Sequence, residues 1–302
     1  MKSSTLQDRP APHWTSANNR SRSQTLRVVR RLLYKTLVYL LLAFVGLVFM
    51  LPLLWMLTTA IKPLPDIFKI PPVWIPNPPL WSQLWQPWIE REFTTYWLNS
   101  VKISGLSVIG AVLSSSLVAY AFARLRWPGR DLFFLLTLSA MMLPFQVRII
   151  PLFLIFKQLG WINTHLPLIV PHFFGGAFEI FLLRQYFRSL PGDLDDSAKI
   201  DGASYFRIYW NILLPLTKPA LAAVAIFTFM NEWNAFLTPL IYLSAREKYV
   251  LAIGMAMMRD EFTIDWGDMM AISFLVTLVP LLVFFFAQKY FIRGIAMTGI
   301  KA

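Results

Sequence analysis

Hydrophobicity divided into segments of membrane-spanning length is the feature that most constrains how this chain folds. An α-helix needs about 20 mostly apolar residues to cross a hydrocarbon core of about 30 Å. Four charge-free stretches of that length occupy residues 36–61, 103–123, 158–178 and 269–288. Two more stretches hold one charge each, residues 132–156 with Arg148 and residues 219–244 with Glu232. The sequence therefore predicts six transmembrane helices, with the fourth continuing through Glu179 to about residue 184.

The composition and the periodicity support an all-α membrane protein. Hydrophobic residues make up 57% of the 302-residue chain and charged residues only 15%, whereas soluble domains are about a quarter charged. The alternation over about ten residues that marks a membrane β-strand is absent, so helices are expected to satisfy the backbone hydrogen bonds inside lipid. The chain has no cysteine, which excludes disulfides and thiolate chemistry.

Lys and Arg residues fall mainly in alternate segments between the predicted spans. The first 35 residues hold eight of them against the single acid Asp8. More lie in the segments that follow the second, fourth and sixth spans, at Arg124, Arg126, Arg130, Arg184, Arg188, Lys199, Arg207, Lys218, Lys289, Arg293 and Lys301. The positive-inside rule therefore places both termini in the cytoplasm. The formal charge of +12 follows from this topology and does not indicate nucleic-acid binding, because the basic residues form no single face.

The predicted topology divides the chain into three parts. A basic cytoplasmic tail covers residues 1–35, a six-helix transmembrane domain covers residues 36–292, and a second cytoplasmic tail covers residues 293–302. The longest outer loop, residues 62–97, is rich in proline and tryptophan, which favours an aromatic belt held in an extended path at the membrane interface. A platform that meets an external partner protein is the alternative, and both can hold together.

The segment between the fourth and fifth spans, residues 187–217, is called the inner loop below and is far longer than a simple connection requires. A Pro-Gly pair predicts a turn, and Asp193 is placed to cap the short helix that follows. Gly202 tolerates the left-handed conformation that ends such a helix. Ser204 is placed to cap a second, amphipathic helix on the membrane surface. One face of that helix is expected to carry Phe206, Tyr209, Trp210 and Leu213.

The inner loop resembles the EAA loop of ABC importer permeases, whose pattern is Glu-Ala-Ala, three residues and glycine, followed by a Pro-rich entry to the next span. Asp196, Ser197 and Ala198 stand at the Glu-Ala-Ala positions, and Gly202 stands at the glycine. The chain departs from the pattern at Asp196 and Ser197, which keep a carboxylate and a small side chain. The carbohydrate branch of that family, the smaller permease of maltose-type importers, is similar in the segments LNSVKIS (98–104), IPLF (150–153), LGWINT (159–164) and EWNAFLTPLIYL (232–243).

The resemblance implies a type I ABC importer permease bundle in the bacterial cytoplasmic (inner) membrane, carrying a sugar or sugar-like solute. It implies that the first helix of the inner loop sits in a cleft of a separate ATPase, with coupling through residues 190–221. Asp196 is the expected charged contact, with a solvated helix charge as the alternative, and Ala198 is the close-packing position. Gly202 is the expected turn beside Asp201, and Ser197 completes the set. The implied partners are a second permease subunit, two copies of the cytoplasmic ATPase, an external solute-binding protein and membrane lipid.

The sequence itself disfavours other functional classes. No Gly-x-x-x-x-Gly-Lys-Ser/Thr phosphate loop occurs, so the chain is expected to be a transport subunit, with ATP and Mg²⁺ bound by the partner. The only histidines, His13, His165 and His172, are accompanied by no carboxylate pair or metal-ligand spacing, which disfavours a metal site, a resident cofactor or an enzyme. The repeated halves of secondary transporters and the charge rings of channels are also lacking.

Polar residues inside the predicted spans are the candidates for a translocation path, since a charge there costs roughly 2.5–3.5 kcal/mol. Asn231, Asn234 and Thr238 fall at i, i+3 and i+7 on the fifth span, with Glu232 one step to the side. Such a stripe is suited to lining a hydrated path where sugar hydroxyls meet amide and carboxylate groups. Hydrogen bonding to the neighbouring subunit is the equal alternative.

Other features of the spans also have two explanations. Glu179 either lies on the same path or pairs in the interior with a cation such as Arg184 or Arg148. Arg148 itself either extends toward the outer interface or faces the interior of the bundle. Small residues at helical spacing on the second span favour close helix packing over a binding site. They are Ser104, Ser107, Ala111 and Ser114.

Overall fold

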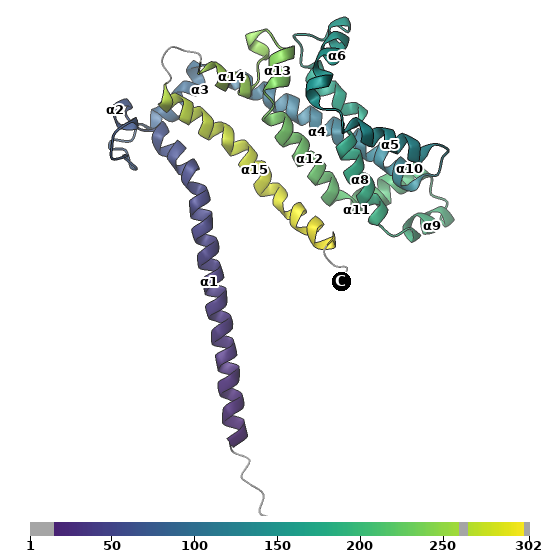
Figure 1. Ribbon diagram of the computed structural model, residues 1–302, viewed down its shortest axis with the longest axis horizontal. Coiled ribbons are helices and arrows are strands. Elements are labelled where there is room, and N and C mark those ends of the chain that lie inside the picture. The colour runs from purple at the N-terminus through teal and green to yellow at the C-terminus, as the bar shows by residue number, and fades with distance from the viewer. Residues whose placement is uncertain (1–14, 260–264, 299–302) are drawn as a thin grey trace, which may run out of the picture. The chain divides into compact units, whose positions relative to one another are not determined.

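The computed structural model describes residues 15–259 and 265–298, and this part of the chain contains helices and no strands (Figure 1). The chain forms two compact units, one ending at Trp55 and the other beginning at Met56. The first unit consists of most of α1 (Thr15–Ala60), whose apolar part, Val29–Ala60, is long enough to cross a bilayer. The helix begins well inside the predicted N-terminal tail because residues 15–35 contain no proline or glycine.

The second unit is a bundle in which α4 (Phe93–Arg124) is the central helix (Figure 1). The helices that pack most extensively against α4 are α8 (Ala177–Ser189) and α12 (Lys218–Trp233). A fourth long helix, α15 (Trp266–Thr298), packs against α12. The largest group of buried apolar residues lies where α4 and α8 meet the inner loop, and it includes Leu183, Phe187, Tyr209, Leu213 and Val224.

A face of small residues allows other segments to approach α4 closely. Three members of the predicted packing face are buried, which confirms that prediction: Ser104, Ser107 and Ala111. Gly110 lies on the same helix, where an added Cβ would come within 2.6 Å of the Phe173 ring. The missing side chain at Gly110 therefore makes room for η2 (Val170–Phe174), a 3₁₀ segment that packs on α4.

Four helices in the described part of the chain are long and apolar enough to cross a membrane. They are Val29–Ala60, Phe93–Arg124, Leu166–Ser189 and Trp266–Lys289. Two bent pairs bring the number to the predicted six when each pair counts as one span. One pair is α5 (Arg130–Ala140) with α6 (Phe145–Gln158), bent by 100°, and the other is Tyr205–Leu216 with Lys218–Trp233, bent by 77°.

The boundaries of the later spans differ from the predicted ones for identifiable reasons. The third span is divided between Ala140 and Phe145, where Pro144 directly precedes α6 and disfavours a helical conformation in the residue before it. The fourth begins at Leu166 and not at residue 158, since Gly160 and Asn163 turn the chain with φ of 71° and 58°. The fifth loses its last residues because α12 ends at Trp233.

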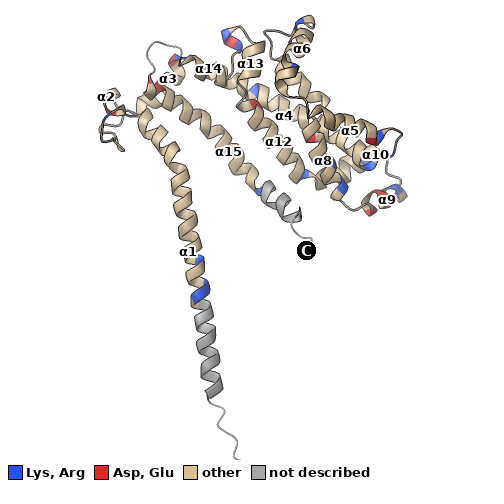
Figure 2. Ribbon diagram, viewed as in Figure 1, with Lys and Arg blue, Asp and Glu red and all other residues tan. Residues whose placement is uncertain are grey.

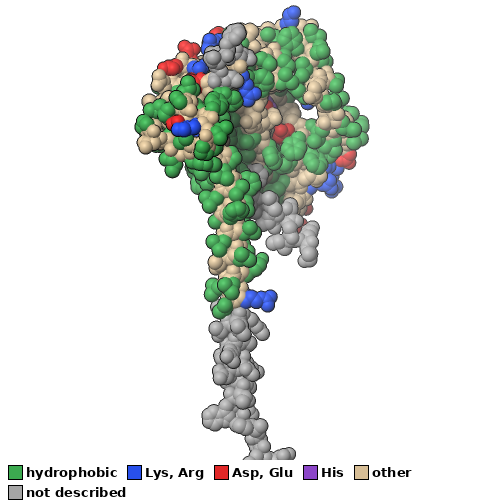
Figure 3. Space-filling model, turned by 60° about the vertical axis from the view of Figure 1, so that its left-hand side comes forward, with side chains coloured by type: hydrophobic (Ala, Val, Ile, Leu, Met, Phe, Trp, Pro, Cys, Tyr) green, Lys and Arg blue, Asp and Glu red, His purple; other side chains and the backbone are tan. Residues whose placement is uncertain are grey.

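Short helices complete the second unit. The outer loop contains α2 (Leu64–Ile67), η1 (Trp81–Leu84) and α3 (Gln86–Glu90). The inner loop contains α9 (Asp193–Ile200), α10 (Tyr205–Arg207), η3 (Ile208–Leu213) and α11 (Leu214–Leu216). The others are α7 (Leu166–Ile169), α13 (Leu237–Tyr242), η4 (Arg246–Lys248) and α14 (Leu251–Met257). Charged residues gather around α9 and α10 at one end of the unit and around α13 and α14 at the other (Figure 2). Figure 3 shows a face covered largely by hydrophobic side chains.

Candidate functional sites in the inner loop and a polar cavity

The first helix of the inner loop, α9, is short, acidic at its start and closed by glycine. Gly192 precedes it, and the Gly192 carbonyl accepts the backbone N–H of Asp195 at 2.9 Å. Asp193 is the first helical residue and not the cap that the sequence predicts. Its negative charge still interacts favourably with the positive N-terminal end of the helix dipole. At the other end Gly202 adopts φ +76°, which confirms the predicted left-handed turn.

The second helix of the inner loop begins at Ser204, whose hydroxyl accepts a backbone N–H three residues on at 3.3 Å and so confirms the predicted cap. After α10 the chain continues as η3, a π-helical stretch whose i→i+5 hydrogen bonds change the angular spacing of its side chains. Tyr209 and Leu213 are buried, whereas Phe206 and Trp210 are 64% and 51% exposed. The rings of Phe206, Tyr209 and Trp210 nevertheless lie together, with centroids 6.1–6.3 Å apart, so these three residues share one side as predicted, and that side extends from the interior to the surface.

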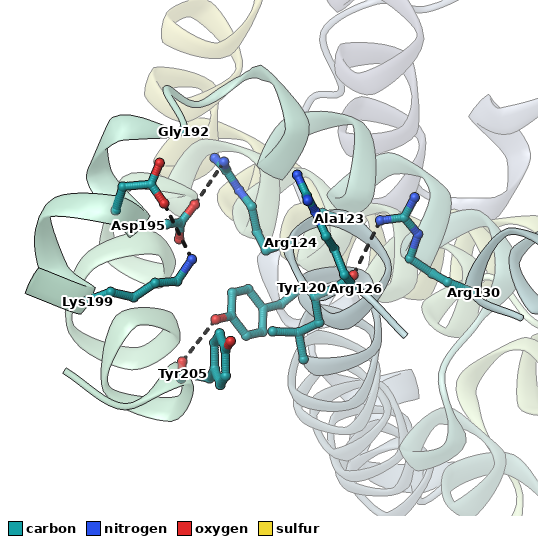
Figure 4. Close-up of a pocket in the computed structure, with 11 residues that line it drawn as sticks. Tyr120, Ala123, Arg124, Arg126, Arg130, Gly192, Asp195, Lys199 and Tyr205 are labelled. Carbon is teal, nitrogen blue, oxygen red and sulfur yellow. Dashed lines mark hydrogen bonds and ion pairs between the residues drawn. The ribbon is translucent and has the colours of Figure 1, made fainter. Parts of the chain in front are cut away.

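A nearly buried ion pair fixes α9 to the end of α4 (Figure 4). Arg124, the last residue of α4, places Nη1 2.9 Å from Asp195 Oδ2 and donates from Nη2 to the Leu190 carbonyl oxygen at 2.8 Å. The two charged side chains are only 12% and 11% exposed. Burial raises the pKa of the Asp195 carboxyl, and the positive charge of Arg124 opposes that rise. A cavity of about 640 Å³ lies at this junction, lined mainly by charged side chains and two tyrosines.

The structure separates the predicted coupling residues into exposed and buried ones. Four are exposed: Asp196, Ser197, Asp201 and Gly202. Asp196 Oδ1 lies 3.5 Å from Lys199 Nζ, in an ion pair that solvent screens. Ala198 is only 6% exposed and packs inside its own subunit, where its carbonyl accepts the Ala203 N–H at 2.9 Å. Large apolar side chains are also exposed on the loop, at Ile200, Tyr205, Phe206 and Trp210.

A cavity of about 760 Å³, called the polar cavity below, opens at the end of α12 among α6, α7, η2 and α13. Four of the predicted path residues line it: Asn231, Glu232, Asn234 and Thr238. They do not form the predicted helical stripe, because α12 ends at Trp233 and the chain turns before α13 begins. The Asn234 side chain donates to the Met230 carbonyl at 2.7 Å, and the Asn234 backbone N–H donates to the same carbonyl at 3.3 Å, so Asn234 closes the end of the helix.

Glu232 is the charged centre of the polar cavity. Its Oε1 lies 3.3 Å from His172 Nε2 and accepts the Asn231 side-chain N–H at 3.0 Å. The Glu232 side chain is 9% exposed, so water screens both contacts only weakly. Arg148 lines the same cavity, which favours the interior over the outer interface for its side chain. Sequence reasoning did not select His172, because a single histidine in an apolar run carries no spacing that points to a partner.

Glu179 lies in the first turn of α8, beside a second cavity of about 340 Å³. That cavity shares His172 and Asn231 with the polar cavity, so the two hollows are neighbours. The Glu179 carboxylate folds back over the start of its helix, where a Cβ on Gly176 would overlap it. The structure thus brings all five predicted path residues into one region of the bundle.

Among the described residues, Glu179 forms no ion pair with Arg184 or Arg148, so that alternative is wrong. Arg184 is buried and satisfied without an acid. Its guanidinium lies 3.8 Å above the Phe134 ring, and its Nε donates to the Phe122 carbonyl at 3.3 Å. A cation–π contact and a carbonyl therefore replace the carboxylate that the sequence suggested.

The polar cavity is suited to binding a polar solute. Its side chains offer amide, hydroxyl and carboxylate groups beside the aromatic rings of Phe156 and Tyr242. Such a lining bonds hydroxyl groups and packs against apolar faces of a ligand. Within the residues that the structure describes, no three His, Cys, Asp or Glu side chains are grouped so as to hold a metal ion.

Residues 111–297 match the family described as binding-protein-dependent transport system inner membrane component. The chain is 35% identical over 263 residues to the arabinooligosaccharides transport system permease protein of Halalkalibacterium halodurans, covering 86% of this chain and 94% of that protein. It is 33% identical over 257 residues to the diacetylchitobiose uptake system permease protein of Streptomyces coelicolor, covering 84% of each. It is 33% identical over 238 residues to the sn-glycerol-3-phosphate transport system permease protein of Yersinia enterocolitica, covering 76% of this chain and 84% of that protein.

A solved structure has the same fold. It is a chain of a bacterial ABC transporter involved in the import of the acidic polysaccharide alginate, with a TM-score of 0.75 at 23% identity, covering 86% of this chain and 96% of that one. This likeness confirms the predicted all-α bundle of the type I ABC importer kind. The chain therefore belongs to the family of binding-protein-dependent transport system inner membrane components, as a multi-pass permease subunit of the bacterial inner membrane and not an enzyme.

Proposed function

We propose that the chain is the permease subunit of an ATP-driven importer for a sugar or sugar-like solute, and that it forms half of the translocation path. Its relatives are named for arabinooligosaccharides, diacetylchitobiose and sn-glycerol-3-phosphate, and the solved structure belongs to an alginate importer. The common chemistry of these solutes is a chain or ring bearing two or more hydroxyl groups. The lining of the polar cavity supports the same class, because amides and carboxylates bond hydroxyls and aromatic rings pack on sugar faces.

The proposed assembly contains a second permease subunit, two copies of a cytoplasmic ATPase and an external solute-binding protein. ATP and Mg²⁺ are bound by the ATPase, since this sequence contains no phosphate loop of the Gly-x-x-x-x-Gly-Lys-Ser/Thr kind. The family description itself names a binding protein. The inner loop faces the ATPase and both termini lie in the cytoplasm, as the distribution of Lys and Arg favours.

The observation that carries this proposal is the exposed surface of the inner loop. The Asp196 side chain is 75% exposed and held only by a screened contact, so it is available to an Arg or Lys of the ATPase. Ile200 is 86% exposed, and covering so much apolar surface favours association with a partner. Ala198 supports α9 from the inside, while the exposed turn is completed by Ser197, Asp201 and Gly202.

The proposed mechanism is alternating access. ATP binding closes the ATPase dimer, the inner loops move with it, and the two permease subunits open toward the loaded binding protein. Five polar residues of this chain then meet the solute: Asn231, Glu232, Asn234, Thr238 and Glu179. Hydrogen bonding of these residues to the second permease subunit is the competing role, and it predicts loss of assembly, not loss of uptake, when they are replaced.

Reconstitution of the complete complex in proteoliposomes tests this function. The chain is combined with a candidate second permease, ATPase and solute-binding protein from the same organism, and a panel of sugars and polyol phosphates is offered. We expect uptake that requires ATP and every component, together with ATPase activity stimulated by the loaded binding protein. Uptake by this chain alone would contradict the proposal, as would labelling of the inner loop by an impermeant reagent added outside cells.

A further inference from the structure

Three polar side chains of α4, spaced four residues apart, hold the inner loop. The spacing places Ser116, Tyr120 and Arg124 on one side of the helix. Ser116 Oγ lies 2.7 Å from the Tyr209 hydroxyl of η3, and the Tyr120 hydroxyl donates to the Tyr205 carbonyl of α10 at 3.0 Å. Arg124 pairs with Asp195 of α9, as described above. Each of these three elements of the loop therefore has its own bond to α4.

The middle of α4 is bonded to the segment that walls the polar cavity. The Ser107 hydroxyl donates to the Leu168 carbonyl of α7 at 3.2 Å, and the Ser114 hydroxyl donates to the His172 carbonyl of η2 at 2.9 Å. His172 is the residue whose ring contacts the Glu232 carboxylate. One continuous helix thus bonds both to the inner loop and to the backbone that positions the charged centre of the cavity.

The covalent connections between the inner loop and the spans are bent. The loop joins α12 through a bend of 77° and contains the π-helical η3. It joins α8 through the turn at Pro191 and Gly192. Such breaks absorb changes in backbone angle. By contrast, α4 is a continuous helix of 32 residues without proline, which at 1.5 Å per residue extends about 48 Å.

We propose that α4 transmits movement of the inner loop to the polar cavity, with Arg124 as the positioning residue that fixes α9 to α4. The inference rests on the proposed function, because the ATPase supplies the movement. The Arg124–Asp195 pair is nearly buried, so removing either partner leaves a desolvated charge, and the pair holds while the loop moves. The exposed Asp196–Lys199 pair carries no such cost and is free to exchange Lys199 for a residue of the ATPase.

A thiol placed in the polar cavity reports whether the movement arrives there. The chain has no cysteine, so Thr238→Cys provides a single reactive thiol in this subunit. In the complete complex we expect its modification rate by a small maleimide to differ several-fold between the nucleotide-free and the ATP-trapped states. In Arg124→Gln the difference should fall below twofold, and the ratio of stimulated to basal ATPase activity should fall at least fivefold. A purely structural role for Arg124 would lower the amount of complex but leave the rate difference per complex intact.

Two further variants make the test specific. Arg130→Gln is the matched control, because Arg130 bonds an acid and a backbone carbonyl at the same end of the molecule, Asp131 and Leu125, but neither belongs to the inner loop. It should retain the rate difference. The double variant Arg124→Gln with Asp195→Asn should be no more impaired than Arg124→Gln alone, since both changes remove one interaction.

The outcomes separate this inference from the proposed function. If the modification rate of the thiol depends on nucleotide in the parent complex and still does so in Arg124→Gln, transmission of movement through Arg124 and α4 is contradicted, whereas the proposed function is not. A parent complex that lacks both nucleotide-dependent modification and ATPase stimulation overturns the proposed function instead. If Arg124→Gln does not assemble, Tyr120→Phe removes only the hydroxyl bonded to Tyr205 and should lower the stimulation ratio about two- to fivefold. If the ratio of stimulated to basal ATPase activity is unchanged in Tyr120→Phe, the proposal that α4 transmits movement is contradicted.

Discussion

The inner loop and the polar cavity both hold charges in an apolar protein, but they hold them differently. In the inner loop, Asp195 pairs with Arg124 from another helix, and both side chains are nearly buried. In the polar cavity, Glu232 is held by its neighbour Asn231 and by His172, beside about 760 Å³ of open space. The first arrangement selects one geometry, whereas the second leaves polar groups facing a space that solute can enter.

The backbone that carries the charged residues also differs between the two regions. The Asp195 carboxylate belongs to a helix, α9, that an ion pair links to the end of the continuous α4. The cavity residues lie where regular helices stop, since α12 ends at Trp233 and His172 belongs to the 3₁₀ segment η2. Irregular backbone within a membrane is tolerated where protein or a water-filled cavity satisfies it. The difference fits the proposal that movement passes through α9 and α4 and that rearrangement occurs at the cavity, where helices end.

The largest expected effect comes from a matched pair of glycine substitutions, one in the inner loop and one outside it. Gly202 and Gly160 both adopt left-handed φ, +76° and +71°, and neither has an atom near the position of an added Cβ. A β-branched residue at either site costs a comparable strain, of the order of 1–3 kcal/mol. We expect Gly202→Val to abolish stimulation of the ATPase by the loaded binding protein while the chain still inserts, and Gly160→Val to retain stimulation. Equal loss in both variants would show that the strain, and not the place of the turn, matters.

Glu232→Gln is expected to have the next largest effect. The change removes the charge that faces His172 but keeps the shape of the side chain. Because a hydrogen bond to a charged group contributes about 1.5–3 kcal/mol, we expect uptake in proteoliposomes to fall about tenfold or more. Stimulation of the ATPase should change little, in contrast to Gly202→Val. Glu179→Gln is the control, since Glu179 lies in the neighbouring cavity, and its effect should be smaller. Loss of the permease pair instead of uptake would favour the role in subunit assembly.

The inner loop was largely predictable because its chemistry is local. The cap at Ser204 and the turn at Gly202 depend on residues within a few positions of each other, so both could be inferred from the sequence. The partner of Arg124 could not be inferred. Three acids stand close together at the start of α9, and only the position of α9 in the folded chain decides that Asp195 pairs with Arg124 while Asp196 stays exposed.

The polar cavity was predictable in composition but not in geometry. The residue types of Asn231, Glu232 and Asn234 stood out against an apolar span, and all three do line one cavity. The end of α12 at Trp233 was not predictable, because residues 230–236 contain no proline or glycine. The role of His172 was equally hidden, since it depends on a contact across sixty positions of the chain that no local pattern encodes.

A moderate effect is expected from acid, and it should affect the two regions unequally. Burial raises the pKa of the Asp195 carboxyl, while Arg124 and Lys199 oppose the rise and Asp196 adds to it. Between the ordinary carboxyl pKa of about 3.9 and the raised value, the folded chain holds a proton on Asp195 that the unfolded chain does not. Lowering the pH through this window therefore adds to the free energy of unfolding, as far as Asp195 is concerned, yet removes the charge that pairs with Arg124.

The ratio of stimulated to basal ATPase activity should accordingly fall by about twofold as the inner pH is lowered toward that window, without a matching drop in thermal midpoint. Asp195→Asn, which carries no titrating group, should show a low and pH-independent ratio. The measurement is the ratio of stimulated to basal ATPase activity for the parent and for Asp195→Asn, recorded over a pH series in liposomes of the same composition. An identical pH profile for the parent and Asp195→Asn would show that another group governs the response.

The smallest expected effect is that of Ser204→Ala, and it separates local stability from transmission. The Ser204 hydroxyl caps α10 and makes no bond to α4, so its loss should cost about 1 kcal/mol of stability. The bonds of Ser116, Tyr120 and Arg124 to the inner loop remain in place in this variant. Thermal unfolding in detergent should therefore begin a few degrees lower, while the ratio of stimulated to basal ATPase activity stays at the parent value. If Ser204→Ala lowered that ratio as far as Arg124→Gln does, any loosening of the inner loop would uncouple the complex, and the bonds to α4 would have no special part in carrying movement to the polar cavity.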